Sequence, residues 1–433
     1  MPDSGHIIRS GPRRRSASTR AAALVTGAVL AGTLSLPASA LASQAGRSTA
    51  AAAAASAATA GHLWSWGHND QGQLGDGTLR DHKVPVRVAL PAGTLVTSIR
   101  TDCGHSVAVT AGGAALAWGF NGDGQLGIGS MVNHRRPVRV HLPKGVKVTA
   151  VRAACAFDLA LTTTGRVLAW GFGGNGQLGD GSPKLHKAPV FVHLPKNTKV
   201  TAISAGGNHS LALTSAGRVL AWGDNSSGQL GDGTTRNRFL PVTVHLPKGT
   251  RATSVAGGER HSLAMTSSGL FAWGDNSSSQ LGDGTNLDRH TPEHIVVSVP
   301  GPSPGRITAL AAGCFHSLAL TSKGKLLAWG SNLLGQLGDG TTTSRAAPVK
   351  VALPAGTKVK SVSAGCTHSL ALTTTGHVLA WGNNGHGQLG INSETDSDFP
   401  RKVHLAANLR AVAIGSGPDA DESFAVTVLQ PVA

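Results

Sequence analysis

The chain has 433 residues, of which 58 are Gly, 8 are Trp and none is Tyr, and only 14% are charged. Gly runs at about twice and charge at about half of average usage, which argues against a helical protein because Glu, Lys and Gln favour helices. An apolar content of 40% can fill a core and excludes a disordered chain. The formal net charge of +16 points toward anionic partners.

Residues 1–42 have the pattern of a secretory signal peptide. Five arginines precede an apolar run at 21–36, and Ala38-Ser39-Ala40 and Ala40-Leu41-Ala42 both fit a cleavage site. The run is shorter than the roughly 20 residues of a membrane span, so we favour cleavage over an anchor. A twin-arginine signal is the alternative to the general export route, which we prefer because bulky apolar residues do not follow the arginines. The sequence therefore predicts a secreted protein.

The rest of the chain divides into a linker, one repeat domain and a tail. Residues 43–61 are mostly Ala and Ser and are predicted to form the linker; 62–429 form the domain and 430–433 the tail. Cleavage after Ala42 removes five Arg and one Asp, which leaves 33 basic and 21 acidic residues and a net charge of +12. No transmembrane segment is expected in the mature chain.

One unit of about 52 residues recurs through the domain. The pair Trp-Gly marks each copy, at Trp66, Trp118, Trp170, Trp222, Trp273, Trp329 and Trp381. One unit contains four strand signals, at Val200–Ala205, His209–Thr214, Arg218–Trp222 and Pro241–Val244, and no helical period. Seven units of four antiparallel strands predict an all-β protein, a seven-bladed β-propeller.

The two ends of the domain are complementary. The chain enters at His62–Trp66 with a third-strand pattern and leaves at Ser423–Thr427 with a second-strand pattern. Pairing of these segments would build one blade from both termini and remove the free sheet edges. The sequence therefore predicts a closed ring.

The repeat resembles the regulator of chromosome condensation repeat family. The resemblance rests on the His-Ser-Leu-Ala-Leu-Thr strand, the Val-Leu-Ala-Trp-Gly strand and the Asn-x-x-Gly-Gln-Leu-Gly loop, and covers the chain from Gly61 to about Leu429. It implies a seven-bladed propeller used as a binding platform, and the signal peptide suggests an exported bacterial type. The copies depart from the pattern locally, at Phe157, Gly173, Ser279 and Glu422.

The recurring Trp and His residues are predicted to be structural. The seven Trp occupy one place in each third strand, which favours packing between blades over a ligand cage; Trp64 is assigned to the core as well. His105, His209, His261, His316 and His368 each open a second strand, so they are distributed around the ring. A metal needs its ligands within about 2 Å, so we expect packed, hydrogen-bonded imidazoles.

Nothing in the repeat indicates catalysis or a cofactor. Asp76, Asp180, Asp232, Asp283 and Asp339 come one per loop, which favours turn capping over a calcium site. Motifs for hydrolases, metalloproteases and phosphate-binding loops are absent from the sequence. We expect no enzyme, no metal and no cofactor, and keep a site built across blades in reserve.

Four cysteines share one repeat position, two residues before the second strand. Cys103 and Cys155 belong to neighbouring units, as do Cys314 and Cys366. Disulfides are permitted in an exported protein, but they need Cα atoms within about 7 Å. Because neighbouring blades are usually farther apart, we favour four small buried thiols over two disulfides.

Basic residues concentrate in loops that a propeller would place on one face. These are Lys144, Lys147, Arg166, Lys196, Lys199, Arg218, Lys248, Arg251, Arg306, Lys323, Lys325, Lys358 and Arg410. The loops that hold them contain no Asp or Glu. The charge either keeps the protein soluble or binds an anionic partner.

Two classes of function remain open. The first is an exported, non-enzymatic, monomeric propeller that binds a wall polymer, a lipid surface or extracellular nucleic acid through the basic loops. The second is a protein-binding propeller such as an inhibitor of a secreted enzyme, since some exported bacterial relatives bind β-lactamases. The absence of Tyr weakens the second class.

Overall fold

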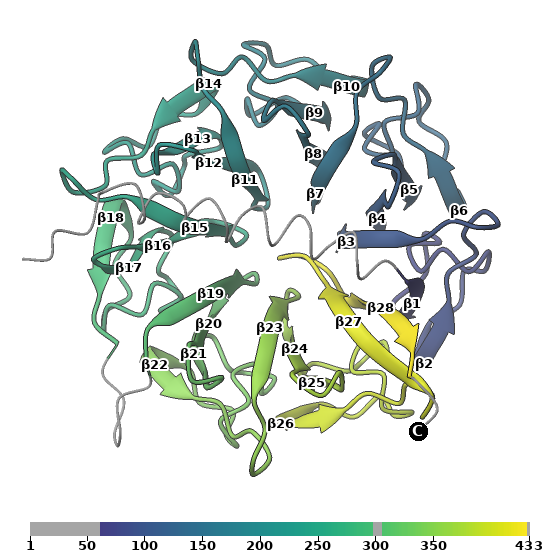
Figure 1. The fold of residues 1–433 in the computed structure, drawn as a ribbon. Coiled ribbons are helices and arrows are strands. Elements are labelled where there is room, and N and C mark those ends of the chain that lie inside the picture. Colours follow the sequence, from purple (N-terminus) through teal and green to yellow (C-terminus); the bar gives the residue numbers. More distant parts are fainter. Residues whose placement is uncertain (1–60, 298–304, 431–433) are drawn as a thin grey trace, which may run out of the picture. The chain divides into compact units, whose positions relative to one another are not determined.

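The computed structural model describes residues 61–297 and 305–430. The chain divides into a unit of residues 1–48, outside the described residues, and a unit of residues 49–433 that holds every described strand. Within this second unit, seven four-stranded antiparallel sheets surround a common axis (Figure 1), and the described residues contain no α-helix. The predicted all-β seven-bladed propeller is confirmed. The predicted signal peptide and nearly all of the predicted linker fall outside the described residues.

Six blades use four consecutive strands each, from blade 1 (β3 to β6) to blade 6 (β23 to β26), and the closing blade uses both ends of the chain. The inner strands are β3 (Val96–Asp102), β7 (Val148–Ala154), β11 (Val200–Ala205), β15 (Ala252–Gly257), β19 (Ile307–Ala312), β23 (Val359–Ala364) and β27 (Leu409–Gly415). The second strands are β4 (His105–Thr110), β8 (Phe157–Thr162), β12 (His209–Thr214), β16 (His261–Thr266), β20 (His316–Thr321), β24 (His368–Thr373) and β28 (Glu422–Leu429). The third strands are β5 (Ala115–Gly119), β9 (Val167–Gly171), β13 (Val219–Gly223), β17 (Gly269–Gly274), β21 (Leu326–Gly330), β25 (Val378–Gly382) and β1 (His62–Gly67). The outer strands are β6 (His134–Arg139), β10 (His186–Phe191), β14 (Arg238–Thr243), β18 (Arg289–Ile295), β22 (Arg345–Lys350), β26 (Ser397–Lys402) and β2 (His82–Arg87).

The closing blade joins the two ends of the domain in the predicted way. Its strand order is β2-β1-β28-β27, with two strands from each end. His62 pairs with Thr427 and Trp66 with Ser423, in an uninterrupted antiparallel register. The predicted pairing of the entry and exit segments is confirmed, and both central strands of the closing blade, β1 and β28, are paired on both sides.

The outer strands depart from the predicted bounds because each contains an irregular register. In blade 3 the outer strand begins at Arg238, three residues before the predicted start. Its register shifts between Ala221 and Gly223, and Pro241 lies in the stretch opposite that shift. A proline lacks an N–H to donate, so a bulge on the outermost strand is a position where it costs little.

The seven Trp residues lie between blades, as predicted. Each is fully buried. Each indole Nε1 donates a hydrogen bond of 2.7 to 2.9 Å to the backbone carbonyl of the loop glutamine in the preceding blade. The ring closes through the same contact, from Trp66 to Gln388 at 2.9 Å. Gly231 shows why glycine follows in that loop, because a Cβ there would lie 2.8 Å from Nε1 of Trp273 and its φ is +63°.

Trp64 departs from its predicted place in the core. Its side chain is only partly buried, although the equivalent Leu220 and Phe271 are buried. The indole Nε1 has no hydrogen-bond partner. The indole is larger than the leucine side chain of most copies, so part of it remains outside the space between the blades.

The strand-opening histidines are packed and hydrogen-bonded, as predicted. All five are fully buried. The Nε2 atoms of His209 and His261 lie 2.9 Å from the hydroxyls of Ser262 and Ser317 in the next blade. A histidine makes such a polar contact across five of the seven seams, and Phe157 and Glu422 replace it at the other two. His105 differs, because its partner is a carboxylate, as described below.

Candidate functional site

Twelve of the thirteen basic residues predicted to form a binding surface lie in loops at one end of the blades, and Arg410 is the second residue of β27 at the same end. These loops are the hairpin turns between second and third strands and the connections from each outer strand to the next inner strand. The two kinds of loop are hydrogen-bonded together, for example from the backbone N–H of Ser215 to the carbonyl of Lys199 at 2.8 Å. All thirteen side chains are exposed. We call this end of the propeller the basic face.

Few of the positive charges on the basic face are neutralised by ion pairs within the protein. Apart from Lys323, none of the thirteen forms an ion pair within the described residues. Arg166 lies over the ring of Phe191, with its guanidinium carbon 3.4 Å from the ring centroid. Arg410 donates from Nη2 to the carbonyl of Thr374 at 3.3 Å. These contacts hold two guanidinium groups in place without cancelling their charge.

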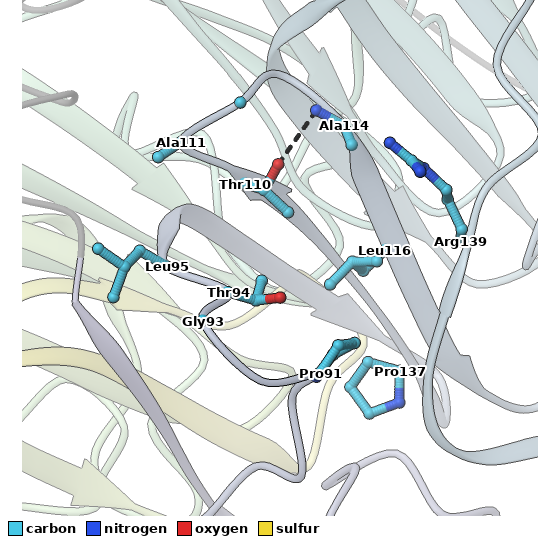
Figure 2. Close-up of a pocket in the computed structure, with 11 residues that line it drawn as sticks. Pro91, Gly93, Thr94, Leu95, Thr110, Ala111, Ala114, Leu116, Pro137 and Arg139 are labelled. Atoms are coloured by element: carbon cyan, nitrogen blue, oxygen red, sulfur yellow. Dashed lines mark hydrogen bonds between the residues drawn. The ribbon is translucent and has the colours of Figure 1, made fainter.

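Hollows with apolar walls lie beside the basic loops (Figure 2). One of about 430 Å³ is lined by Pro91, Leu95, Leu116, Pro137 and Arg139. Leu95 stands where the other blades have Lys or Arg, and Arg139 is the one basic side chain among the residues that line this hollow. Figure 2 shows the Thr110 hydroxyl accepting a hydrogen bond from the N–H of Ala114, which fixes the neighbouring hairpin turn.

A second hollow, of about 460 Å³, lies on the basic face of blade 5, beside the connection that leads from this blade to blade 6. Its lining includes Lys325, Lys350 and Leu353. The hollows can therefore take an aliphatic or ring group of a partner while the ammonium groups at the rim attract its negative charge.

The opposite end of the propeller, which we call the long-loop face, uses most of its carboxylates internally. The N–H of Thr234 donates to Asp232 at 3.0 Å, and Arg238 forms an ion pair with the same carboxylate at 2.6 Å. Burial acts to raise the pKa of Asp232, but the hydrogen bonds from Thr234 and Arg238 outweigh it and hold that pKa below its ordinary value. The predicted turn-capping role of these aspartates is confirmed.

Apolar side chains are exposed on the long-loop face. Leu79, Val132, Leu287 and Leu333 belong to the long loops between third and outer strands, and Leu333 is 75% exposed. The two faces of the ring thus differ in chemistry, since one has uncompensated basic groups and the other has capped carboxylates beside exposed apolar groups.

Two disulfides link neighbouring blades near the axis, and the prediction of four free thiols is wrong. Cys103 pairs with Cys155 and Cys314 with Cys366. Their Cα atoms are 4.7 and 4.5 Å apart, because inner-strand turns converge on the axis more closely than the blades do elsewhere. Each disulfide staples two blades, blade 1 to blade 2 and blade 5 to blade 6.

Three buried or partly buried carboxyl groups lie together near the axis, where blade 1 meets the closing blade. Asp102 and Glu422 are at most 1% exposed, and the N–H of Asp419 donates to Asp102 at 2.6 Å. Burial, with repulsion from neighbouring acids, raises the pKa of Glu422 to about 8 and of Asp419 to about 7. These carboxyls are therefore protonated over much of the ordinary pH range. The sequence marked Glu422 as a departure from the repeat but did not reveal the cluster.

Two arginines line the axial cavity behind these carboxyls. The cavity has a volume of about 90 Å³ and is bordered by Arg100, Arg152 and Ser204. The equivalent positions in the next two blades are Ala256 and Ala311, which leave room at the axis. Burial, together with the nearby Arg100 guanidinium, lowers the pKa of Arg152 to about 9. Aligning the copies would have shown these two large residues among small ones.

One seam contains a buried histidine–aspartate pair. His105 and Asp158 are fully buried, and the imidazole Nε2 lies 3.0 Å from Oδ1 of Asp158. Burial raises the pKa of Asp158, although His105 acts against the shift. Asp158 replaces the serine of the other copies, so this pair is a local variant of the seam contact.

Comparisons with known proteins agree with the repeat. Residues 183–428 match the model of the RCC1-like domain, and residues 60–109 and 112–161 match the regulator of chromosome condensation (RCC1) repeat. Ultraviolet-B receptor UVR8 of Arabidopsis thaliana is 33% identical over 341 residues, which cover 78% of this chain and 77% of that protein. Secretion-regulating guanine nucleotide exchange factor of Bos taurus is 32% identical over 396 residues, which cover 83% and 82%.

A solved structure gives the same architecture. Prp20p from Saccharomyces cerevisiae, described with its binding to Gsp1p and histones, matches with a TM-score of 0.75 at 25% identity, over 86% of this chain and 92% of that one. These three relatives are eukaryotic, so export and bacterial origin remain predictions from the sequence. None of the described segments forms a helix able to cross a membrane.

Proposed function

Because this chain belongs to the regulator of chromosome condensation (RCC1) repeat family of β-propellers, we propose that it is a non-enzymatic binding protein whose basic face holds an anionic polymer. The observation that carries the proposal is the set of thirteen exposed basic residues in loops without Asp or Glu. Charges spread around a ring suit a polymer with repeated negative groups better than one small ligand.

We further propose that the partner lies outside the cell. The signal-peptide pattern at 1–42 supports export, although it falls outside the described residues. The two disulfides add a second line of support, because disulfides form and persist mainly in oxidising compartments. The candidates are an anionic wall polymer, a lipid surface and extracellular nucleic acid.

Retention on a polyanion resin tests the basic face directly. We expect the mature protein to bind at low salt and to elute well below about 0.5 M salt, since exposed charges are screened. Changing Lys147, Lys199 and Lys358 together to Glu should lower the elution salt by at least a factor of two.

The matched control makes the same charge change on the long-loop face, with Arg80, Arg136 and Arg236 changed to Glu. All three are exposed. If the elution salt falls equally in the two triple variants, retention depends on net charge and not on the basic face, and the proposal would be rejected. Retention that survives about 0.5 M salt, or that never occurs, would also reject an electrostatic mechanism.

A protein partner on the long-loop face is the second candidate. Prp20p is described as binding Gsp1p and histones. Exposed Leu287 and Leu333 provide the apolar contacts that such a partner would cover. A secreted enzyme captured by the intact protein, but not by a variant with both leucines changed to Asp, would favour this candidate.

A further inference from the structure

Two imidazoles and a carboxylate meet at the seam between blade 6 and the closing blade. His68 follows β1, Asp81 precedes β2, and His386 lies in the loop between β25 and β26. The Nδ1 atom of His386 is 2.8 Å from Oδ2 of Asp81. The two imidazole rings lie with their centroids 4.2 Å apart. One donor atom from each of the three residues lies within 4.8 Å of the other two.

The combination is specific to this seam. The repeat position of His68 is occupied in the other copies by Phe120, Phe172, Asp224, Asp275, Ser331 and Asn383. The position of His386 is occupied by Gln71, Asp123, Asn175, Ser227, Ser278 and Leu334. None of the other six seams brings two imidazoles together at these positions, so the pair does not belong to the structural repeat.

Asp81 has one oxygen free for this site. Its Oδ1 accepts a hydrogen bond from the N–H of Asn69 at 2.8 Å, which caps the long loop as in other blades. The same bond fixes the carboxylate so that Oδ2 faces His386. The loop cap therefore orients the carboxylate toward the two imidazoles.

His68 is held loosely. Its Nδ1 lies 3.3 Å from Nε2 of Gln73, and its Nε2 lies 3.5 Å from Oδ1 of Asp70. Both contacts are long for hydrogen bonds, so replacing either by a coordinate bond costs little.

Negative charge surrounds the site. Asp70 and Asp81 are exposed, and the backbone of His68 donates to the carbonyl of Asp421 at 3.2 Å. Lys83, two residues after Asp81, is paired with Glu394 at 2.8 Å. A cation at the seam would thus meet favourable electrostatics.

We propose that His68, Asp81 and His386 bind a divalent transition-metal ion of the zinc type. Imidazole nitrogen and carboxylate oxygen are its preferred ligands, at about 2.0–2.2 Å. A tetrahedral ion would draw the donor atoms to about 3.4 Å from one another. The side chains are 27%, 39% and 43% exposed, for His68, Asp81 and His386, and can make that movement.

Three protein ligands leave one or more coordination positions open to water or to an outside ligand. Mg²⁺ and Ca²⁺ are disfavoured, since they prefer oxygen ligands and the triad supplies only one carboxylate. The ion would join blade 6 to the closing blade, a seam that neither disulfide crosses.

Titration of ZnCl₂ into the metal-free mature protein, made without a histidine tag, tests the site. We expect one high-affinity ion per chain by calorimetry and a rise in the unfolding temperature with zinc. His68→Gln and His386→Gln should each weaken zinc binding at least tenfold and abolish the rise, without changing the circular dichroism spectrum of the metal-free protein.

His186→Gln is the matched control, because His186 lies 2.8 Å from the Asp180 carboxylate and has no second imidazole beside it. It should bind zinc like the parent. Zinc binding that His68→Gln leaves unchanged, equal losses in His186→Gln, or equal binding of Mg²⁺ would each overturn the proposal. Retention on the polyanion resin should be the same in all these variants, so the site and the proposed function can fail separately.

Discussion

Buried titratable side chains divide into two sets that respond to pH in opposite directions. Burial lowers the pKa of the seam imidazoles, to about 4 in His209 and His316 and to about 3 in His261 and His368. Burial raises the pKa of Glu422 to about 8. The folded state therefore favours the neutral form of both kinds of group. Protonation of the histidines at low pH and ionisation of Glu422 at high pH each destabilise the fold.

The sign of each contribution follows from proton counting. Below about pH 6.5 the unfolded chain protonates its histidines more than the folded one, so stability falls as pH falls toward 4. Between about pH 4.5 and 8 the folded chain holds a proton on Glu422 that the unfolded chain releases, so stability falls as pH rises. At about pH 4.5 to 6.5 both trends act, and the four histidines outnumber Glu422, so we expect maximal stability near pH 6.5 and a fall on either side.

Glu422→Gln should remove much of the loss on the alkaline side. Glutamine keeps the shape of the buried carboxylic acid and can still accept the hydrogen bond from Thr101. The free energy of unfolding of the variant, relative to the parent, should grow between pH 6.5 and 8 by up to about 2 kcal/mol. Denaturant titrations at several pH values measure it. Glu394→Gln, at an exposed carboxylate, should show no such trend; a flat difference for Glu422→Gln would disprove the assignment.

For individual residues, the sequence predicted their positions in the repeat better than the side chains that they contact. Seven Trp at one repeat position were correctly assigned to the seams, because a repeated large apolar residue needs a repeated place to pack. Glu422 was recognised as an exception among the strand-opening histidines. Its association with Asp102 and Asp419 could not be predicted, since those residues belong to different parts of the chain and meet only at the axis.

The structural unit of this fold is the four-stranded blade, and each of the two disulfides links two neighbouring blades. The two cysteines of each disulfide are 52 residues apart in the sequence. Removing such a link lowers the free energy of unfolding by about 2–4 kcal/mol. Changing Cys314 and Cys366 together to Ala should therefore lower the free energy of unfolding by about that amount.

The corresponding change at Cys103 and Cys155 should have a similar effect, which makes the two pairs controls for each other. The measurements are denaturant unfolding without reductant and a count of free thiols in the unfolded protein. We expect no free thiols in the parent. Four free thiols in the parent, or double variants as stable as the parent, would contradict the two disulfides between blades.

Blade order, strand number and loop placement were all predictable, because the sequence repeats and antiparallel strands fix which loops share a face. Distances between blades were not. The spacing of Cys103 and Cys155 showed that they occupy equivalent turns in neighbouring blades, but not how closely inner-strand turns approach at the axis. The histidines at the zinc-type site were missed for a related reason, because His68 and His386 lie outside the repeated residues and meet only after the ring closes.

The ring as a whole depends on the pairing of its two ends. A linear array tolerates loss of a terminal strand when a capping unit covers the exposed face, but a closed propeller has no such unit. Here β28 lies between β1 and β27, so the closing blade cannot hold β27 without it. The Ser423 hydroxyl in this strand also makes two contacts at the seam: it donates to the carbonyl of Gln388 at 3.0 Å and lies 2.8 Å from Nε2 of His368.

Deleting the chain from Ser423 onward should therefore destabilise every blade, because each depends on its neighbours. We expect the truncated protein to aggregate or to unfold far below the parent, since β1 would expose a strand edge and buried Trp66 and Phe424 contacts would be lost. Deleting residues 43–60, assigned to the linker from the sequence, should change little and is the control. Thermal unfolding followed by circular dichroism compares the three proteins. A C-terminal deletion that unfolds at the temperature of the parent would show that the pairing of β1 with β28 does not hold the ring closed.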